Sequence, residues 1–128
     1  MTPRATIGNF FEKLLPSYPG IEIKFIEANI HEETAALAHG YDAICAFVNA
    51  DLGAPVIEEL HRQGVKLILM RCAGYNNVDL ETTAKCGIQV ARVPGYSPEA
   101  VAEHAMALAL TANRHTHKAY IKCRENNF

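Results

Sequence analysis

The chain has 128 residues, of which 49% are hydrophobic and 20% charged, and its net charge is −2. This is the composition of a folded domain with a buried core, and it excludes a disordered chain. Because Lys and Arg form no cluster and no apolar stretch approaches the roughly 20 residues of a membrane span, we expect neither a nucleic acid nor a membrane as a partner.

The first third of the chain alternates between helical and extended patterns. Hydrophobic residues recur at helical spacing over residues 10–15, and a Pro- and Gly-containing stretch ends that helix. Strict alternation over 21–25 predicts a half-exposed strand, and 32–38 predicts a short helix. Residues 43–48 are continuously apolar, which predicts a strand covered on both faces.

The next segments repeat the same rhythm. A helix with one apolar face is expected near residues 56–60, and a buried strand follows at 65–70. A second helix is expected over 78–86 with Gly87 as its stop, and a last strand over 88–93. The strands start roughly 22 residues apart, about one βα unit each, which predicts an α/β fold: a parallel sheet with helices on both faces.

A long helix is expected after this sheet. Ser97 is a favourable N-cap, Pro98 suits the first helical position, and Glu99 complements the helix dipole. The apolar period continues to at least Arg114, and a helix reaching Cys123 would have about 25 residues and span ~38 Å. Its Ala-rich face predicts packing against a second domain or another subunit.

The loop over residues 71–79, with sequence RCAGYNNVD, follows a buried strand. Open α/β sheets bind ligands at the carboxyl ends of their strands, and the backbone amide of Gly74 has no side chain over it. An anion site and a plain tight connection are equally compatible with these residues. The eight glycines form no Gly-x-Gly-x-x-Gly or Walker pattern, so a Gly-rich phosphate loop is not expected.

Cysteines and histidines give no reactive cluster. The four cysteines contain no Cys-x-x-Cys pair, which predicts free thiols and a cytoplasmic location, and Cys72 is more readily explained as a buried thiol than as a nucleophile. His115 and His117 are two residues apart on the expected helix and should face different ways. Surface histidines are therefore favoured over a metal site.

Two aromatic and two basic residues lie where strands end. Phe47 and Tyr96 are each equally compatible with ligand contact and with packing. Arg71 and Arg92 end neighbouring strand patterns, where a guanidinium can attract an anion. Solvent exposure or an ion pair is the favoured interpretation of both.

Three segments together resemble one family. Residues 41–49 (YDAICAFVN), 65–80 (VKLILMRCAGYNNVDL) and 90–105 (VARVPGYSPEAVAEHA) closely resemble the NAD-dependent D-2-hydroxyacid dehydrogenases, with fermentative D-lactate dehydrogenases as the nearest branch. The resemblance covers about residues 10–128.

This resemblance implies a flavodoxin-like substrate domain over residues 1–97. It also implies a long helix over 98–128 that begins a Rossmann coenzyme domain and helps to form a homo-oligomer. The implied ligand is a small 2-keto or 2-hydroxy acid. The residues implied to contact the substrate or the coenzyme are Ala73 and Gly74 (backbone amides for the substrate carboxylate), Phe47 and Tyr96 (aromatic walls of the substrate pocket) and Val101 (near the nicotinamide of NAD).

The family's coenzyme fingerprint and its catalytic Arg, Glu and His come from sequence later than Phe128. We therefore expect no catalytic residue in this chain, no NAD bound by it alone, and no interconversion of pyruvate and D-lactate by the isolated chain. Residues 1–9 do not match the family's first strand, which is expected to be missing. The alternatives are a non-catalytic partner that dimerises through residues 98–120 with a full-length relative or with itself, and a gene fragment without function.

Overall fold

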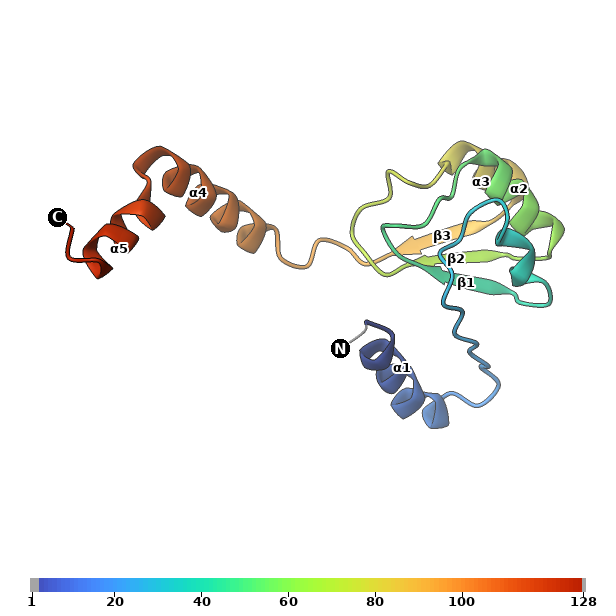
Figure 1. Ribbon diagram of the computed structural model, residues 1–128. Coiled ribbons are helices and arrows are strands. Elements are labelled where there is room, and N and C mark those ends of the chain that lie inside the picture. The colour runs from blue at the N-terminus through green and yellow to red at the C-terminus, as the bar shows by residue number, and fades with distance from the viewer. Residues whose placement is uncertain (1–2, 128) are drawn as a thin grey trace. The chain divides into compact units, whose positions relative to one another are not determined.

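The computed structural model describes residues 3–127, with the backbone alone for residues 3–7. The chain falls into two compact units, Met1–Arg92 and Val93–Phe128. Its elements in chain order (Figure 1) are α1 (Pro3–Leu14), η1 (Leu15–Ser17), η2 (Ala35–Ala38), β1 (Ala43–Ala46), α2 (Ala54–Arg62), β2 (Leu67–Met70), α3 (Leu80–Cys86), β3 (Gln89–Arg92), α4 (Pro98–Arg114) and α5 (Thr116–Arg124).

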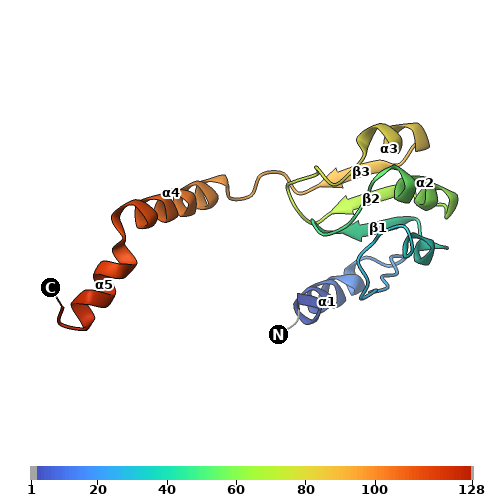
Figure 2. The same ribbon diagram turned by 45° about the horizontal axis from the view of Figure 1, so that its top comes forward.

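The centre of the first unit is a parallel sheet of three strands in the order β1-β2-β3 (Figure 2). The strands pair in register, with Ile44 opposite Ile68 and Ile68 opposite Val90. Successive parallel strands are joined through a helix, as the spacing of the apolar runs requires. The α/β fold with a parallel sheet, expected from the sequence, is thus confirmed, with each strand two residues shorter than its apolar pattern.

The core lies on the face of the sheet that α2 and α3 cover (Figures 1 and 2). Ile68 of β2 is fully buried there, between partly buried Ile44 and Val90. From α2, Val56, Ile57 and Leu60 reach the same cluster at helical spacing. Burying one such side chain stabilises the fold by about 1.5–3 kcal/mol, so this layer fixes the sheet.

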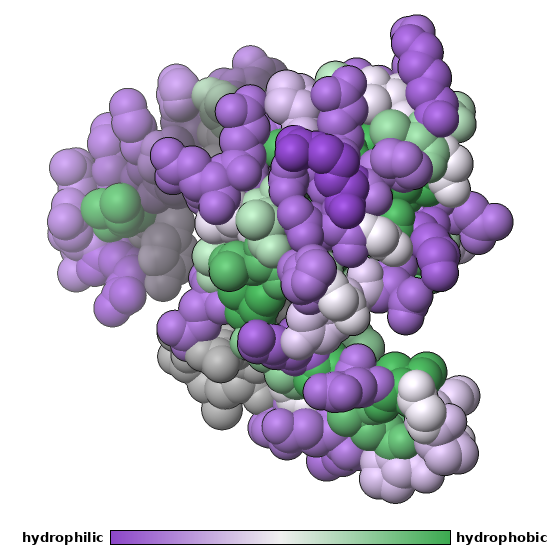
Figure 3. All heavy atoms as spheres, turned by 90° about the vertical axis from the view of Figure 1, so that its right-hand side faces the viewer, coloured by the Kyte–Doolittle hydropathy of each residue, from purple (hydrophilic) through white to green (hydrophobic). Residues whose placement is uncertain are grey.

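The opposite face of the sheet is open. Cys45, Leu69 and Ala91 form one row across the strands, and all three are exposed, Leu69 by 39%. The expectation that both faces of β1 are covered is therefore wrong. A cavity of about 980 Å³ separates this face from α1 and residues 21–30, and its lining is largely apolar. Hydrophobic surface gathers over the N-terminal helical segment at the bottom of Figure 3. Phe10 and Leu14 of α1 are among its exposed hydrophobic residues.

Residues 21–26 correct a second expectation. Their alternation predicted a strand, but they adopt no regular structure. A strand requires a neighbour for its amides and carbonyls, and no strand in the described part of the chain pairs with this segment. The expected helix over 32–38 is also reduced, to a 3-10 turn at η2. Conversely, α1 begins at Pro3, where the sequence showed no pattern.

The second unit consists of α4 and α5. The single helix of about 25 residues expected here is interrupted at His115, whose left-handed backbone (φ 52°, ψ 38°) ends α4 after 17 residues. Histidine adopts this region more readily than most residues, and the surrounding Asn113, Thr116 and His117 favour helix weakly. No residue between 93 and 127 is buried. In the part of the chain described, no helix has the length and hydrophobicity needed to cross a membrane.

Candidate functional site

The candidate site lies at the carboxyl edge of the sheet. Ala46, Met70 and Arg92 end the three strands in register, so the connections that follow them leave at the same edge. Two of these connections belong to the first unit: residues 47–53, which lead to α2, and residues 71–79, which lead to α3. This edge of a parallel sheet is where open α/β folds bind ligands.

Three carbonyl groups of the 71–79 connection accept hydrogen bonds from the chain itself. The Arg92 Nη1 donates to the Ala73 carbonyl at 3.0 Å, and the Cys72 thiol donates to the Gly74 carbonyl at 3.3 Å. The Tyr75 carbonyl accepts from the Val78 amide at 3.0 Å. Three successive carbonyls are thereby directed to groups within the protein.

The amides of Ala73 and Gly74 are left without such partners. Within residues 3–127, neither N–H donates a hydrogen bond to another group of the chain. Gly74 is exposed and its φ is not left-handed, and a Cβ built on it meets nothing within 4 Å. Neither backbone conformation nor packing therefore requires glycine here. Adjacent free amides are available to hydrogen-bond a small anion.

The two connections are tied to each other. The Leu52 amide donates to the Asn77 carbonyl at 3.1 Å, and the Asp79 amide donates to the Leu52 carbonyl at 2.9 Å. These bonds form a short parallel bridge between Leu52 and Val78, and both side chains are buried. The Asn77 Nδ2 adds a bond to the Ala50 carbonyl at 2.9 Å. Asn77 is thus a structural link between the connections rather than a simple turn residue.

The two strand-end arginines each stack on an aromatic ring. The Arg71 guanidinium lies 5.2 Å from the ring centroid of Phe47, and that of Arg92 lies 5.2 Å from the ring centroid of Tyr75. Neither arginine forms an ion pair with the described carboxylates. Of the two alternatives, solvent exposure fits Arg92, which is exposed, while Arg71 is half-buried. Both positive charges remain available to favour an anion at this edge.

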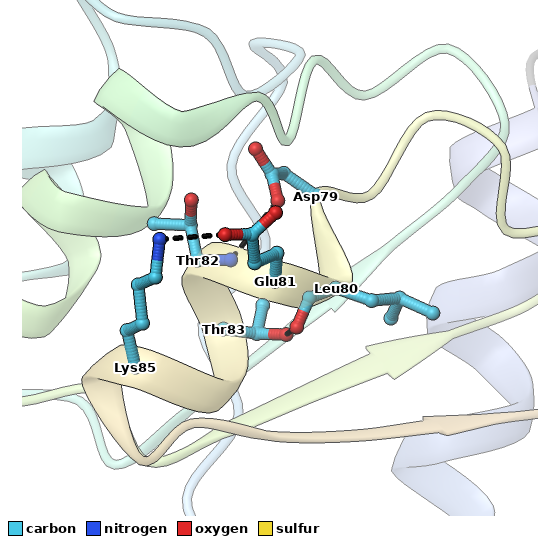
Figure 4. A network of polar contacts seen from close by, with 6 residues as sticks. All are labelled: Asp79, Leu80, Glu81, Thr82, Thr83 and Lys85. Atoms are coloured by element: carbon cyan, nitrogen blue, oxygen red, sulfur yellow. Dashed lines mark hydrogen bonds and ion pairs between the residues drawn. The ribbon is translucent and has the colours of Figure 1, made fainter.

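The carboxyl end of the 71–79 connection is fixed by an N-cap (Figure 4). The Asp79 carboxylate accepts a hydrogen bond from the Thr82 amide at 2.9 Å, as capping aspartates do at helix N-termini. That bond holds the pKa of Asp79 below its usual range. One turn later, the Lys85 Nζ bonds the Glu81 carboxylate at 2.7 Å, and the expected stop at Gly87 is confirmed by its left-handed φ of 68°.

The N-termini of α2 and α3 do not fit the phosphates of a dinucleotide. Asp79 occupies the free amides of α3, and the Asp51 carboxylate accepts from the Gly53 amide at 3.1 Å before α2. A phosphate placed at either helix would face a carboxylate instead of free amides. The site at this edge suits one small anion, and a dinucleotide would require other residues.

The remaining reactive groups do not form a cluster. All four cysteines are free, and partial desolvation at the open face of the sheet raises the pKa of the Cys45 thiol although Arg71 opposes it. Among the described residues, no three His, Cys, Asp or Glu side chains are close enough to hold a metal ion. His115 and His117 do not face different ways as expected, because the helix break brings their rings into edge contact at 6.4 Å.

The predicted site residues divide between the two units. Ala73, Gly74 and Phe47, which is 44% exposed, lie at the carboxyl edge of the sheet in the first unit. Tyr96 and Val101 belong to the second unit, where they are 76% and 72% exposed. Ser97 precedes α4 as its N-cap residue but makes no side-chain capping bond.

The sequence over residues 4–126 matches the model of one protein family, described as the catalytic domain of D-isomer specific 2-hydroxyacid dehydrogenases. The chain belongs to this family. The 2-hydroxyacid dehydrogenase domain matched here includes the whole sheet and both connections at its carboxyl edge.

Individual relatives support the same assignment. The chain is 54% identical over 112 residues to D-lactate dehydrogenase kk1H of Curvularia clavata, which covers 88% of the chain and 32% of the relative. It is 50% identical over 109 residues to D-lactate dehydrogenase of Escherichia coli K12, covering 85% and 33%. The structure of D-lactate dehydrogenase from Aquifex aeolicus complexed with NAD and lactic acid matches 99% of the chain and 36% of that protein, with 26% identity and a TM-score of 0.77. This 2-hydroxyacid dehydrogenase chain therefore spans about a third of the length of these relatives.

Two residues gained a role that the sequence did not predict. Arg92 contacts the 71–79 connection from a strand 19 residues away, and Asn77 bonds Ala50 across 27 residues. The only sequence signal for Arg92 was a cation at the end of the strand next to the suspected loop. Its particular acceptor depends on tertiary structure.

Proposed function

We propose that this chain supplies the substrate-binding part of an NAD-dependent D-lactate dehydrogenase, which interconverts pyruvate and D-lactate. The observation that carries the proposal is the pair of unpartnered amides at Ala73 and Gly74, at the carboxyl edge of a parallel sheet. The domain family and the D-lactate dehydrogenase relatives support the choice of a 2-keto acid as the anion.

In this proposal the substrate carboxylate accepts hydrogen bonds from the Ala73 and Gly74 amides. Two fixed donors orient the carboxylate and cost no reorganisation when it binds. Phe47 supplies one aromatic wall, and its ring is held in place by the stacked Arg71. Tyr96 supplies a second wall and Val101 a contact for the nicotinamide, as residues of the segment that joins the substrate domain (1–97) to the helix opening the coenzyme domain (98–128).

In such an enzyme NADH supplies the hydride that reduces pyruvate, and NAD accepts it in the reverse direction. Carboxylates occupy the N-termini of α2 and α3, where the phosphates of a dinucleotide would otherwise meet free amides. We therefore expect the purified 128-residue chain to show no NADH-dependent reduction of pyruvate. Measurable turnover by this chain would contradict that expectation, while leaving the binding role to be tested separately.

Nuclear magnetic resonance tests the binding role directly. We expect pyruvate to shift the amide signals of Ala73 and Gly74 with a midpoint in the range of about 1–50 mM, as two hydrogen bonds to one carboxylate permit. Methyl pyruvate is the matched control, because it keeps the keto group and lacks the carboxylate. Sodium chloride at equal ionic strength controls for screening. Equal shifts with methyl pyruvate, or none with pyruvate, would exclude the proposed site.

A second candidate function is association through α4. Val101 and Leu108 are seven residues apart on one face of this helix, and Met106 and Leu110 lie toward the other, all more than half exposed. A helix that is apolar on two sides is normally covered on both. Light scattering after size exclusion tests this candidate: we expect a dimer, converted to monomer by Leu108→Glu. A monomeric wild-type chain would rule out self-association.

The cellular location follows as a further part of the proposal. Four free cysteines, of which Cys72 is buried beside the proposed carboxylate site, suit a reducing compartment such as the cytoplasm. Fractionation of cells expressing the tagged chain tests this, and recovery in an oxidising compartment would contradict it.

A further inference from the structure

Arg92 contacts the 71–79 connection through a carbonyl and a side chain, and not through the free amides of the candidate site. Its Nη1 donates to the Ala73 carbonyl at 3.0 Å, and its guanidinium also stacks over the Tyr75 ring. These two contacts lie on either side of Gly74, the residue of the connection with the greatest backbone freedom. The thiol of Cys72 holds the carbonyl of Gly74 itself. The backbone carbonyls of Ala73 and Gly74, and the side chain of Tyr75, are thus held by groups outside the carboxylate site.

The Ala73 carbonyl and the Gly74 amide belong to one peptide group. All peptide bonds among the described residues are trans, so this C=O and N–H point in opposite directions from the same plane. A cation bound to the oxygen withdraws electron density through the peptide and makes its N–H a stronger donor. The guanidinium therefore acts on the amide that faces away from it.

We propose that Arg92 is a positioning residue for the carboxylate site: it aims the Gly74 amide and strengthens it as a hydrogen-bond donor. This inference rests on the proposed function, since it names the amide that would hold the substrate. It makes Arg92 a contributor to affinity without contact between its side chain and the substrate. The second strand-end arginine, Arg71, stacks on Phe47 and forms no hydrogen bond with a carbonyl of the 71–79 connection.

The ligand-free chain gives the first test. We expect Arg92→Met to move the Gly74 amide proton signal upfield, by more than any amide of α2, because the polarising cation is lost. Arg71→Met is the matched control: it removes the same charge and a stacking contact from the neighbouring strand end, and should leave the Gly74 signal in place. Circular dichroism checks that both variants stay folded. An unchanged Gly74 signal in Arg92→Met overturns the inference.

Pyruvate titration gives the second test. We expect Arg92→Met to weaken binding about five- to tenfold, and Arg92→Lys to recover at least half of that loss on a logarithmic scale, because an ammonium group can also donate to the carbonyl. Equal losses in both variants would indicate a merely structural role and contradict the inference. If the wild-type chain binds no pyruvate, the proposed function fails, and the ligand-free signal of Gly74 still decides the role of Arg92.

Discussion

The sheet unit and the C-terminal helices differ in what holds them. Every buried hydrophobic residue in the described chain lies between Ala35 and Ile88, and the segment 93–127 contains none. Both units contain helices with apolar residues at helical spacing, so the spacing does not explain the difference in burial. Within nine residues α2 buries three apolar side chains, whereas α4 spans 17 residues and buries none.

The two helices are stabilised in different ways, one by tertiary packing and the other by intrinsic helix propensity. In α2, an apolar face packs on a sheet, and tertiary contact supplies most of the stability. In α4, high helix propensity and a favourable N-terminal sequence act without a core, which leaves a helix marginal in water. Similar sequence signals therefore have very different energetic weight. Matched substitutions in the two units make it measurable.

The largest expected effect on stability comes from replacing a leucine by alanine, and the same substitution can be made in each unit. Leu52 is fully buried and Leu108 is 57% exposed. We expect Leu52→Ala to lower the free energy of unfolding by about 3 kcal/mol, through lost burial and the cavity it leaves. At protein concentrations at which the chain is monomeric, Leu108→Ala should change it by less than about 0.5 kcal/mol. Urea unfolding followed by circular dichroism measures both, and a comparable loss in Leu108→Ala would show that α4 is packed in solution.

The two helix caps provide a smaller contrast. Asp79 accepts a hydrogen bond from the Thr82 amide, whereas Ser97 makes no side-chain capping bond. We expect Asp79→Ala to lower the melting temperature by about 3–5 °C at pH 7, because an amide at the start of α3 loses its acceptor. Ser97→Ala should leave it unchanged within about 1 °C. Scanning calorimetry tests the pair, and equal effects would remove the distinction between the caps.

The Asp79 cap should also depend on pH. Its pKa is lowered in the folded chain, so its stabilisation is present above the unfolded value near 3.9 and is lost as the pH falls through the folded value. The difference in melting temperature between the wild-type chain and Asp79→Ala should therefore shrink when the pH is lowered from about 7 to 3. A difference that stays constant over this range would assign the effect to something other than the carboxylate.

The smallest effect on stability is expected at two glycines. A Cβ added to Gly74 or Gly95 meets no atom within 4 Å, and neither residue has a left-handed φ. Both Gly→Ala substitutions should leave the melting temperature within about 2 °C. Gly74→Ala should still weaken the pyruvate-induced shift of the Ala73 amide, because its methyl group occupies the space above the amides. Unaltered binding in that variant would argue against ligand contact at Gly74.

Local patterns predicted the parts of the fold that local energetics decide. Continuous apolar runs identified β1 and β2, and Gly87 identified the end of α3, since a left-handed residue there suits glycine. The alternation over 21–25 failed because strand formation needs a neighbour that periodicity does not reveal. The prediction of one continuous helix failed at His115 for another reason. Several residues with weak helix propensity act together there, and no single residue indicates the break.

The candidate site was predictable to a similar degree. The position of the 71–79 connection followed from the βα rhythm, and its assignment to a substrate carboxylate came from family resemblance. Which backbone groups stay free did not follow from sequence. It depends on Arg92 and Cys72 occupying particular carbonyls, and those bonds form only after three strands are in register.

The bridge between Leu52 and Val78 has a consequence for motion. Two loops of this length would ordinarily fluctuate independently, each with its own conformational entropy. Joined by two backbone hydrogen bonds and the side chain of Asn77, they form a single closed ring and share their degrees of freedom. A ligand that orders either loop therefore also orders part of the other. The conformational entropy lost on binding at this edge of the sheet is the combined loss of both loops.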